Sequence, residues 1–212
     1  MAKVDRKRTD EQRTDEKQAE ETRAKAGGRR REPLRVLVVR HGVAAKAADT
    51  DRERSADAER QLTDAGRRKM RDAARGLVDL VPDLAGIATS PLARAVETAD
   101  LIARRYAKVG ADPKTIRLPA LAPGKPANAV LGWLAVRPRG GGTVAVVGHE
   151  PGLSQFASWA LTGLWESFVC LKKGQALLLE FDDEVRAGRA RLLWSLRAGQ
   201  LRKIGRAARA EG

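Results

Sequence analysis

The amino-acid sequence predicts an α/β fold: a three-layer sandwich in which helices cover a mainly parallel central sheet. Two predominantly apolar runs, residues 34–39 and 143–147, have the pattern of strands that are covered on both faces. Stretches in which apolar residues recur every three or four positions, as in helices, separate the predicted strands. Strands that alternate with helices in this way are typical of α/β sandwiches.

The first predicted elements are a strand at residues 34–39 and a polar loop over residues 44–61 that follows it. We expect a helix over residues 64–80, because its apolar side chains recur at intervals of three and four. Thr63 stands where the N-cap of this helix belongs. A short strand over residues 86–89 comes next.

A second helix is expected to start at Ser90 and Pro91. Ser90 would be its N-cap first and a site residue second, and Pro91 would occupy the first helical position, where its missing N–H costs nothing. The helix should run to about Tyr106. Residues 107–125 are expected to be irregular, apart from a short strand at residues 115–118.

The remaining elements continue the alternation. We expect helices over residues 127–136 and 153–161, on either side of the strand at residues 143–147. Two further strands, at residues 175–181 and 190–196, are joined by a polar turn.

The sequence divides into one folded domain and two charged ends. Residues 1–32 consist almost entirely of charged, polar and alanine residues, so we expect this segment to be disordered. Residues 33–197 form the predicted domain, and residues 198–212 a basic C-terminal tail. The formal charge of +14 is concentrated near the C-terminus, where residues 186–212 hold 8 Lys/Arg and 1 Asp/Glu.

Composition excludes several classes of protein. The basic tail at residues 198–212 carries no aromatic residues for base stacking among its charges, so nucleic acid is not an expected partner. Cys170 is the only cysteine, which excludes an intramolecular disulfide and a zinc-finger site. No apolar run approaches the length of a membrane span, and the charged N-terminus lacks the apolar core of a signal peptide. We therefore expect a cytoplasmic protein without membrane association; the sequence does not indicate its oligomeric state.

The chain's only two histidines both follow buried strands. Arg40 and His41 come directly after the first strand, and His149 follows the strand at residues 143–147 after one glycine. In open parallel sheets, ligands bind beyond the carboxyl ends of the strands, so both imidazoles should lie at the same edge. Arg94, in the first turn of the helix after the third strand, should join them.

Two imidazoles and two guanidinium groups at one edge indicate a site for a phosphoryl group. The planar fork of arginine matches the oxygens of a phosphate. Gly42 has no side chain and would let backbone N–H groups approach the anion. Taken singly, a histidine at a strand end can be structural, and Arg94 can pair with Glu97 or Asp100 on a helix surface. That three such junctions arise together by chance is much less probable.

These motifs resemble those of the histidine phosphatase superfamily, which has the phosphoglycerate mutase-like fold. The segment from residue 147 to residue 154 is most similar to the SixA branch, the phosphohistidine phosphatases. The resemblance covers about residues 34–197. It rests on Arg40-His41-Gly42, Leu62-Thr63-Asp64-Ala65-Gly66, the segment from Ser90 to Thr98 that contains Arg94, and Gly148-His149.

The resemblance implies a mechanism. His41 would be the nucleophile, neutral and oriented by a backbone hydrogen bond, and would form a covalent phosphohistidine. Arg40, Arg94 and His149 would bind the phosphoryl oxygens, so that neither a metal nor a cofactor is required. Arg60 would either add a phosphate contact or remain a solvated loop charge.

The general acid is not evident from the sequence. Val43 stands where SixA-like proteins often carry Asp. Glu150, beside His149, is the first candidate, and the loop before residue 61 offers Asp49, Asp51 and Glu53. Alternatively no acid is needed, because the imidazole that leaves a P–N bond is easily protonated at neutral pH.

Three functions remain open. The first is a SixA-like phosphatase that acts on phosphohistidine in a partner protein. The second is a small-molecule phosphomonoesterase with the same core. The third is a non-catalytic module that binds phosphate or polyphosphate.

Overall fold

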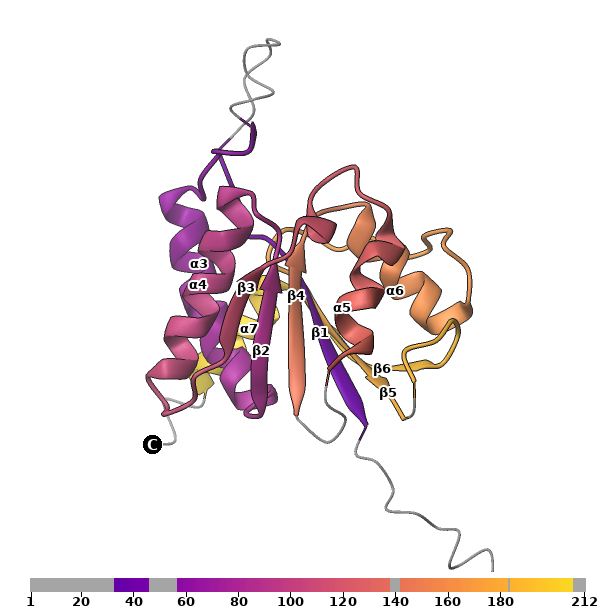
Figure 1. Cartoon of the computed structure of the whole chain (residues 1–212). Coiled ribbons are helices and arrows are strands. Elements are labelled where there is room, and N and C mark those ends of the chain that lie inside the picture. The colour runs from indigo at the N-terminus through magenta and orange to yellow at the C-terminus, as the bar shows by residue number, and fades with distance from the viewer. Residues whose placement is uncertain (1–32, 46–56, 138–141, 183, 208–212) are drawn as a thin grey trace, which may run out of the picture. The chain divides into compact units, whose positions relative to one another are not determined.

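The computed structural model describes residues 33–45, 57–137, 142–182 and 184–207, which form an α/β fold with a six-stranded central sheet (Figure 1). The strand order is β3-β2-β4-β1-β5-β6. The strands are β1 (Leu34–Arg40), β2 (Leu84–Thr89), β3 (Lys114–Arg117), β4 (Thr143–Gly148), β5 (Ala176–Phe181) and β6 (Ala190–Leu196).

The sheet is mainly parallel, as the sequence predicts. β1, β2, β3 and β4 pair in parallel, whereas β5 runs antiparallel to both of its neighbours. The register pairs Arg40 of β1 with Gly148 of β4. The residues that follow these two strands are therefore neighbours at one edge of the sheet.

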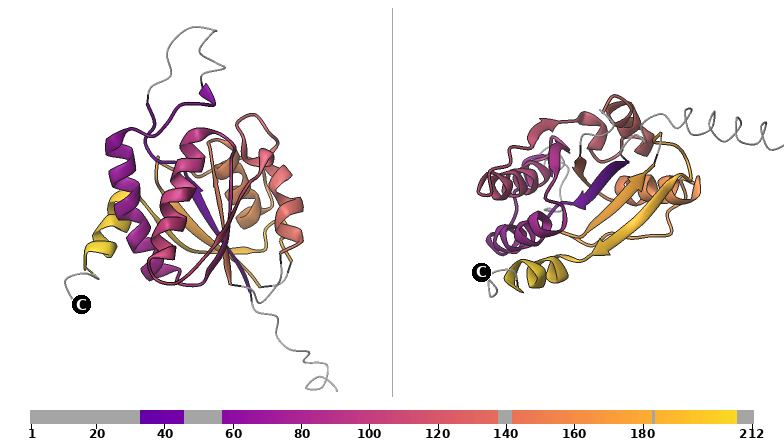
Figure 2. Two further views of the ribbon diagram at one scale, coloured as in Figure 1. Left: turned by 60° about the vertical axis from the view of Figure 1, so that its left-hand side comes forward. Right: turned by 90° about the horizontal axis from the view of Figure 1, so that it is seen from below.

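Helices cover both faces of the sheet, which confirms the three layers (Figures 1 and 2). On one face lie α3 (Asp64–Leu80), α4 (Ala93–Ala107) and α7 (Ala198–Ala207). On the other lie η1 (Pro119–Leu121), η2 (Ala127–Val130), α5 (Leu131–Ala135) and α6 (Gly152–Thr162).

The central strand β1 explains why its sequence is continuously apolar. Val36 and Val38 belong to the core under α6, while Leu37 and Val39 belong to the core under α3 and α4. All four side chains are fully buried. A strand with helices on both faces has no solvent side, so its pattern does not alternate.

Helix α3 matches its predicted bounds. Thr63 is its N-cap, and its hydroxyl oxygen accepts a hydrogen bond of 2.9 Å from the backbone N–H of Gly66. An added Cβ at Gly66 would lie 2.1 Å from the carbonyl oxygen of Val43. The start of α3 is thereby packed closely against the segment that leaves β1.

The start of α4 corrects one prediction. The helix begins at Ala93, its N-cap is Leu92, and no side chain among the described residues caps it. Ser90 is not the cap, because the helix begins only at Ala93; the backbone N–H of Ser90 still donates to the carbonyl of Val147 in the sheet, at 2.9 Å. Its hydroxyl is used at the site described below.

The C-terminal segment corrects a second prediction. Residues 198–207 are not a tail but form helix α7, which packs along α3 and buries Leu201 completely. Gly76 of α3 and Gly205 of α7 permit the close approach, since a Cβ at Gly76 would lie 2.2 Å from the Leu201 carbonyl oxygen. The many basic residues of this segment make its amphipathic pattern hard to recognise in the sequence, and the apolar side of the helix packs against α3.

Smaller differences concern the segment between β3 and β4. The single helix expected over residues 127–136 is a 3₁₀ turn, η2, followed by the short helix α5. The predictions of a disordered segment at residues 1–32 and of a tail at residues 208–212 concern residues outside the described ranges. None of the described helices is both long and apolar enough to cross a bilayer.

Candidate active site

The two histidines meet at the carboxyl edge of the sheet. Their ring centroids are 4.9 Å apart, and each residue is 6% exposed. The backbone N–H of His41 donates to the carbonyl of Gly148 at 3.2 Å. The parallel pairing of β1 with β4 thus places both imidazoles, as the positions of the histidines in the sequence predict.

A hydrogen bond to the backbone orients the imidazole ring of His41 and determines its tautomer. Its Nδ1 lies 2.7 Å from the carbonyl oxygen of Gly42. A carbonyl only accepts, so Nδ1 carries the proton and the lone pair of Nε2 is left for chemistry. Burial, reinforced by the charges of Arg94 and Arg40 and opposed by the Gly42 hydrogen bond, lowers the pKa of His41 to about 4.

His149 has a hydroxyl partner. Its Nε2 lies 2.8 Å from Oγ of Ser90, which also accepts a hydrogen bond of 3.3 Å from the backbone N–H of Leu92. The Ser90 hydroxyl has no other acceptor for its proton among the described residues, so we assign that proton to Nε2 and the His149 proton to Nδ1. Burial and the neighbouring His41 lower the pKa of His149 to about 3.

Arg94 is buried, with 4% of its surface exposed, in the first turn of α4. Its guanidinium group is held by Asp57, through the carboxylate at 3.0 Å and the backbone carbonyl at 2.7 Å. Burial by itself would raise the pKa of Asp57, but hydrogen bonds and attraction from Arg94 and Arg60 lower it overall. The ion pair fixes Arg94 beside the imidazoles, and neither Glu97 nor Asp100 is its partner here.

Arg40 completes the cationic group. Its Nη1 donates to the carbonyl of Leu171 at 2.5 Å, so the loop before β5 holds the guanidinium group. Lys173, in the same loop, adds a charge that slightly lowers the pKa of His41. Arginines and a lysine thus surround two neutral histidines.

A cleft of about 330 Å³ joins these side chains, and four of them have unsatisfied donors. Nε of Arg40, Arg60 and Arg94, and Nδ1 of His149, are buried without a hydrogen-bond partner among the described residues. Buried donors normally find acceptors, so the cleft favours an anion with several oxygens. The cleft is lined by Arg40, His41, Ala44, Asp57, Arg60, Arg94, Pro123, His149, Glu150 and Lys173.

Gly42 has a different role from the one its sequence position suggests. Its backbone N–H donates to Oγ1 of Thr98 at 3.1 Å and is not free for an anion. A Cβ at Gly42 would lie 2.6 Å from Cγ of Met70. The glycine is required for packing against α3 rather than for close approach to a phosphate.

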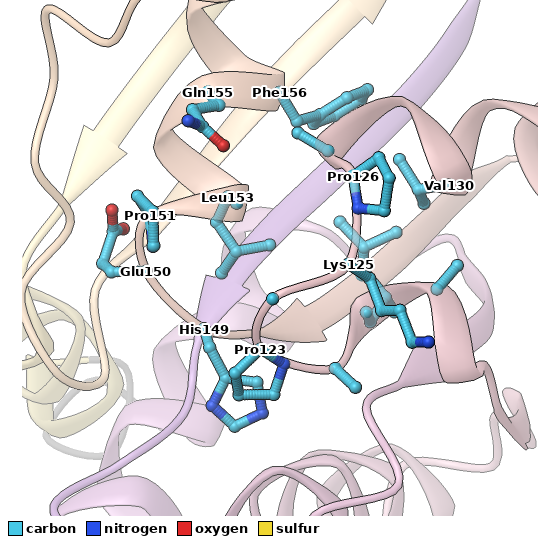
Figure 3. Close-up of a pocket in the computed structure, with 17 residues that line it drawn as sticks. Pro123, Lys125, Pro126, Val130, His149, Glu150, Pro151, Leu153, Gln155 and Phe156 are labelled. Atoms are coloured by element: carbon cyan, nitrogen blue, oxygen red, sulfur yellow. The ribbon is translucent and has the colours of Figure 1, made fainter.

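The structure places both weaker candidates, Arg60 and Glu150, at the cleft. Arg60 pairs with Asp57 at 2.5 Å and donates to the Ala45 carbonyl at 3.2 Å. Glu150 bonds Ser154 through Oε2, and its carboxylate points away from the His149 ring (Figure 3). The other acids proposed from the sequence, Asp49, Asp51 and Glu53, lie outside the described residues.

Sequence reasoning missed three residues of this site: Ser90 as a histidine partner, Asp57 and Lys173. The only sequence signal for Asp57 is its spacing of three residues from Arg60. Its pairing with Arg94 joins residues 37 positions apart. Lys173 precedes β5 without any motif. Among the described residues, no group of three or more His, Cys, Asp or Glu side chains is arranged to hold a metal ion.

Several known proteins are similar to this chain. Residues 36–115 match the model of the histidine phosphatase superfamily (branch 1). An uncharacterized protein of Picosynechococcus sp. is 33% identical over 160 residues, which make up 75% of this chain and 88% of that protein. The described fold is also shared with solved structures.

A structure of the protein histidine phosphatase SixA with tungstate has a TM-score of 0.65 and 23% identity, and the alignment covers 79% of this chain and 99% of SixA. A putative phosphohistidine phosphatase SixA from Nakamurella multipartitia gives 0.60 and 21%, with 78% and 96% covered. A phosphoglycerate mutase from Plasmodium falciparum gives 0.54 and 23%, with 77% and 90% covered. These likenesses confirm the phosphoglycerate mutase-like fold.

Proposed function

Because this chain belongs to the histidine phosphatase superfamily, we propose that it hydrolyses a phosphoryl group through a covalent phosphohistidine on His41. One observation carries the proposal. The unprotonated Nε2 of His41 lies in a cleft lined by three arginines and by His149, and the buried Nε atoms of those arginines and Nδ1 of His149 have no partner among the described residues. A nucleophile beside unsatisfied oxyanion donors is the arrangement that phosphoryl transfer requires.

The proposed reaction has two steps. The lone pair of His41 Nε2 attacks phosphorus, and the bond from phosphorus to the leaving atom breaks with its electrons on that atom, which takes up a proton. Water then attacks the phosphohistidine, the P–N bond breaks, and its electrons return to Nε2, while the water releases a proton. Arg40, Arg94 and Nδ1–H of His149 would bind the non-bridging oxygens in both steps.

Asp57 would position Arg94 rather than take part in the chemistry, because its carboxylate already holds that guanidinium group. Arg60 would add charge at the rim of the cleft. Glu150 would act as the general acid only after a change of rotamer, since its carboxylate points away from the His149 ring and Oε2 accepts from Ser154 (Figure 3). We propose that the arginines supply the charge that Mg²⁺ supplies elsewhere, so excess EDTA should leave turnover unchanged.

We propose phosphohistidine in a partner protein as the substrate, with the chain acting in the cytoplasm. The support is the fold shared with SixA proteins and the unassigned acid, since an imidazole leaving group needs little help to leave. A small-molecule phosphomonoesterase is the second candidate, favoured by a cavity beside the cleft that could hold the rest of a small substrate. A module that only binds phosphate would have no use for a neutral histidine with a free Nε2.

The test is to trap the intermediate. The protein is mixed with ³²P-labelled phosphoramidate, quenched, and examined for label that is acid-labile and base-stable. Because the chain has only two histidines, the variants His41→Gln and His149→Gln assign the label. We expect label in the wild type and in His149→Gln, and none in His41→Gln. An unlabelled wild type, with phosphate binding equal in His41→Ala, would leave only the binding function.

A further inference from the structure

A second cavity adjoins the catalytic cleft. It has a volume of about 280 Å³ and shares Pro123, His149 and Glu150 with the cleft (Figure 3). A phosphoryl group held among Arg40, Arg94 and the two imidazoles would therefore lie at the mouth of a separate, preformed space. The second cavity is not part of the machinery for the phosphoryl group itself.

The walls of this cavity are predominantly apolar. One wall comes from the segment that contains η1 and η2, and the other from the first half of α6. Leu153 and Phe156 project from α6, with Pro126 and Val130 opposite (Figure 3). Besides His149 and Glu150, the only polar side chains among its lining residues are Lys125 and Gln155.

This lining discriminates between classes of leaving group. A sugar buried here would lose hydrogen bonds from several hydroxyls to water and find few partners, which is costly. A flat apolar or aromatic ring loses nothing of that kind and gains from the removal of its surface from water. The volume accommodates a ring system as large as naphthalene, and also the imidazole of a phosphohistidine with an apolar neighbour.

We infer that the cavity between the η1–η2 segment and α6 receives the leaving group of the substrate, and that this group is an aromatic or apolar ring rather than a polyhydroxylated sugar. The inference rests on the proposed function, because it takes the adjoining cleft as the place where phosphorus is attacked. It names the substrate class for that cleft, which the catalytic residues alone do not determine.

The test fills the cavity from each wall. Ala127→Trp introduces a large side chain from η2, and Gln155→Trp introduces one from α6. Ala129→Trp is the matched control, because Ala129 lies in the same 3₁₀ turn, is exposed and does not line the cavity. Circular dichroism melts identify any variant that fails to fold.

Three probes are compared: 1-naphthyl phosphate, glucose 6-phosphate and phosphoramidate, whose leaving group is only ammonia. In the wild type we expect kcat/KM to be higher for naphthyl phosphate than for glucose 6-phosphate. Each cavity variant should lower kcat/KM for naphthyl phosphate by about tenfold or more and leave phosphoramidate within about twofold. Ala129→Trp should change neither.

The outcomes separate the inference from the proposed function. Turnover of phosphoramidate with no preference for the naphthyl ester, or with a preference that the tryptophans do not alter, overturns the inference and leaves the phosphatase standing. If no probe is turned over, the proposed function fails. Binding of 1-naphthylmethylphosphonate then still tests whether the cavity receives an aromatic group. Loss of that binding in both tryptophan variants, with inorganic phosphate still bound, supports it; unchanged binding overturns it.

Discussion

At the scale of single residues, burial decides which protonation state the site holds. His41 and His149 are almost completely buried beside Arg94, and a positive charge on either ring would be both desolvated and repelled. The protein therefore presents neutral imidazoles without a carboxylate base. The hydrogen bonds to Gly42 and Ser90 then decide which nitrogen carries each proton.

The first prediction concerns pH. Because the pKa of His41 is lowered to about 4 and that of His149 to about 3, both rings should be neutral at about pH 6, where an ordinary histidine is mostly protonated. NMR of protein labelled with ¹⁵N-histidine measures this without interference, since no other histidine exists. Titration of either ring near pH 6.5 would show that burial is not the controlling effect.

The second prediction is that the lowered pKa values of the two histidines make the stability of the fold decrease as the pH falls. As the pH falls from 6.5 towards about 4, the unfolded chain takes up protons that the folded protein does not. The free energy of unfolding should therefore decrease through this window. Urea denaturation at several pH values measures the effect, and the variant His41→Gln should show a shallower decrease than the wild type.

The third prediction is that Ser90 positions His149. Ser90→Ala should lower kcat by about tenfold or more, because Nε2 of His149 loses the partner that fixes its tautomer. ¹⁵N shifts should report a changed His149 tautomer while the protein remains folded. Ser167→Ala removes a hydroxyl that bonds only a loop carbonyl, that of Val169, among the described residues, and serves as the control. Equal kcat values and equal ¹⁵N shifts of His149 in both variants would show that Ser90 does not position His149.

The fourth prediction compares two arginines of α4. Arg94→Ala should lower kcat/KM for phosphoramidate by about a hundredfold or more, because a preorganised charge is removed from the cleft. Arg104→Ala, on the same helix but exposed, should have little effect. Since Asp57 would be left without its main partner, Arg94→Lys is included, because it keeps a positive charge near Asp57 and separates the effect of the charge from that of the planar guanidinium group. Similar kinetics for both alanine variants would remove Arg94 from the mechanism.

At the scale of elements, periodicity predicted most strands and helices because these elements bury the residues that define the pattern. The errors arose where another interaction competes with the local signal. Ser90 and Pro91 resemble a helix start, but the backbone of Ser90 remains bonded to the sheet and its hydroxyl to His149. In residues 198–207 the abundant basic side chains concealed a narrow apolar stripe that includes Leu201.

The fifth prediction tests α7 as part of the fold. Leu201→Ala should lower the free energy of unfolding by about 2–4 kcal/mol, because a fully buried leucine is removed from the interface with α3. Lys203→Ala, on the exposed side of the same helix, should change it by less than about 0.5 kcal/mol. Urea denaturation of both variants provides the measurement. Equal stability would mean that α7 docks only weakly.

At the scale of the whole molecule, the sheet explains which site residues were predictable. His41 and His149 are 108 positions apart, yet parallel pairing of their strands predicts that they meet. Asp57 and Lys173 come from connecting segments, and nothing local determines where such segments fold back. Arg40 was placed correctly because it is the last residue of β1 and the sheet fixes its position. Gly42 lies beyond the strand, and its N–H donates to Thr98 of α4, a contact that the local sequence does not predict.

The last prediction is that the domain functions without residues 1–32. The described side chains that line the cleft and the adjoining cavity lie between Arg40 and Lys173, and β1 begins at Leu34, where its pairing with β5 also begins. A chain that starts at residue 33 should therefore turn over phosphoramidate with kcat within about twofold of the full chain, since no group that contacts the phosphoryl oxygens is removed. A small phosphodonor is the necessary substrate, because a protein substrate could also contact the deleted segment. If the truncated chain folds, judged by its thermal melt, but is inactive on phosphoramidate, residues 1–32 belong to the catalytic unit.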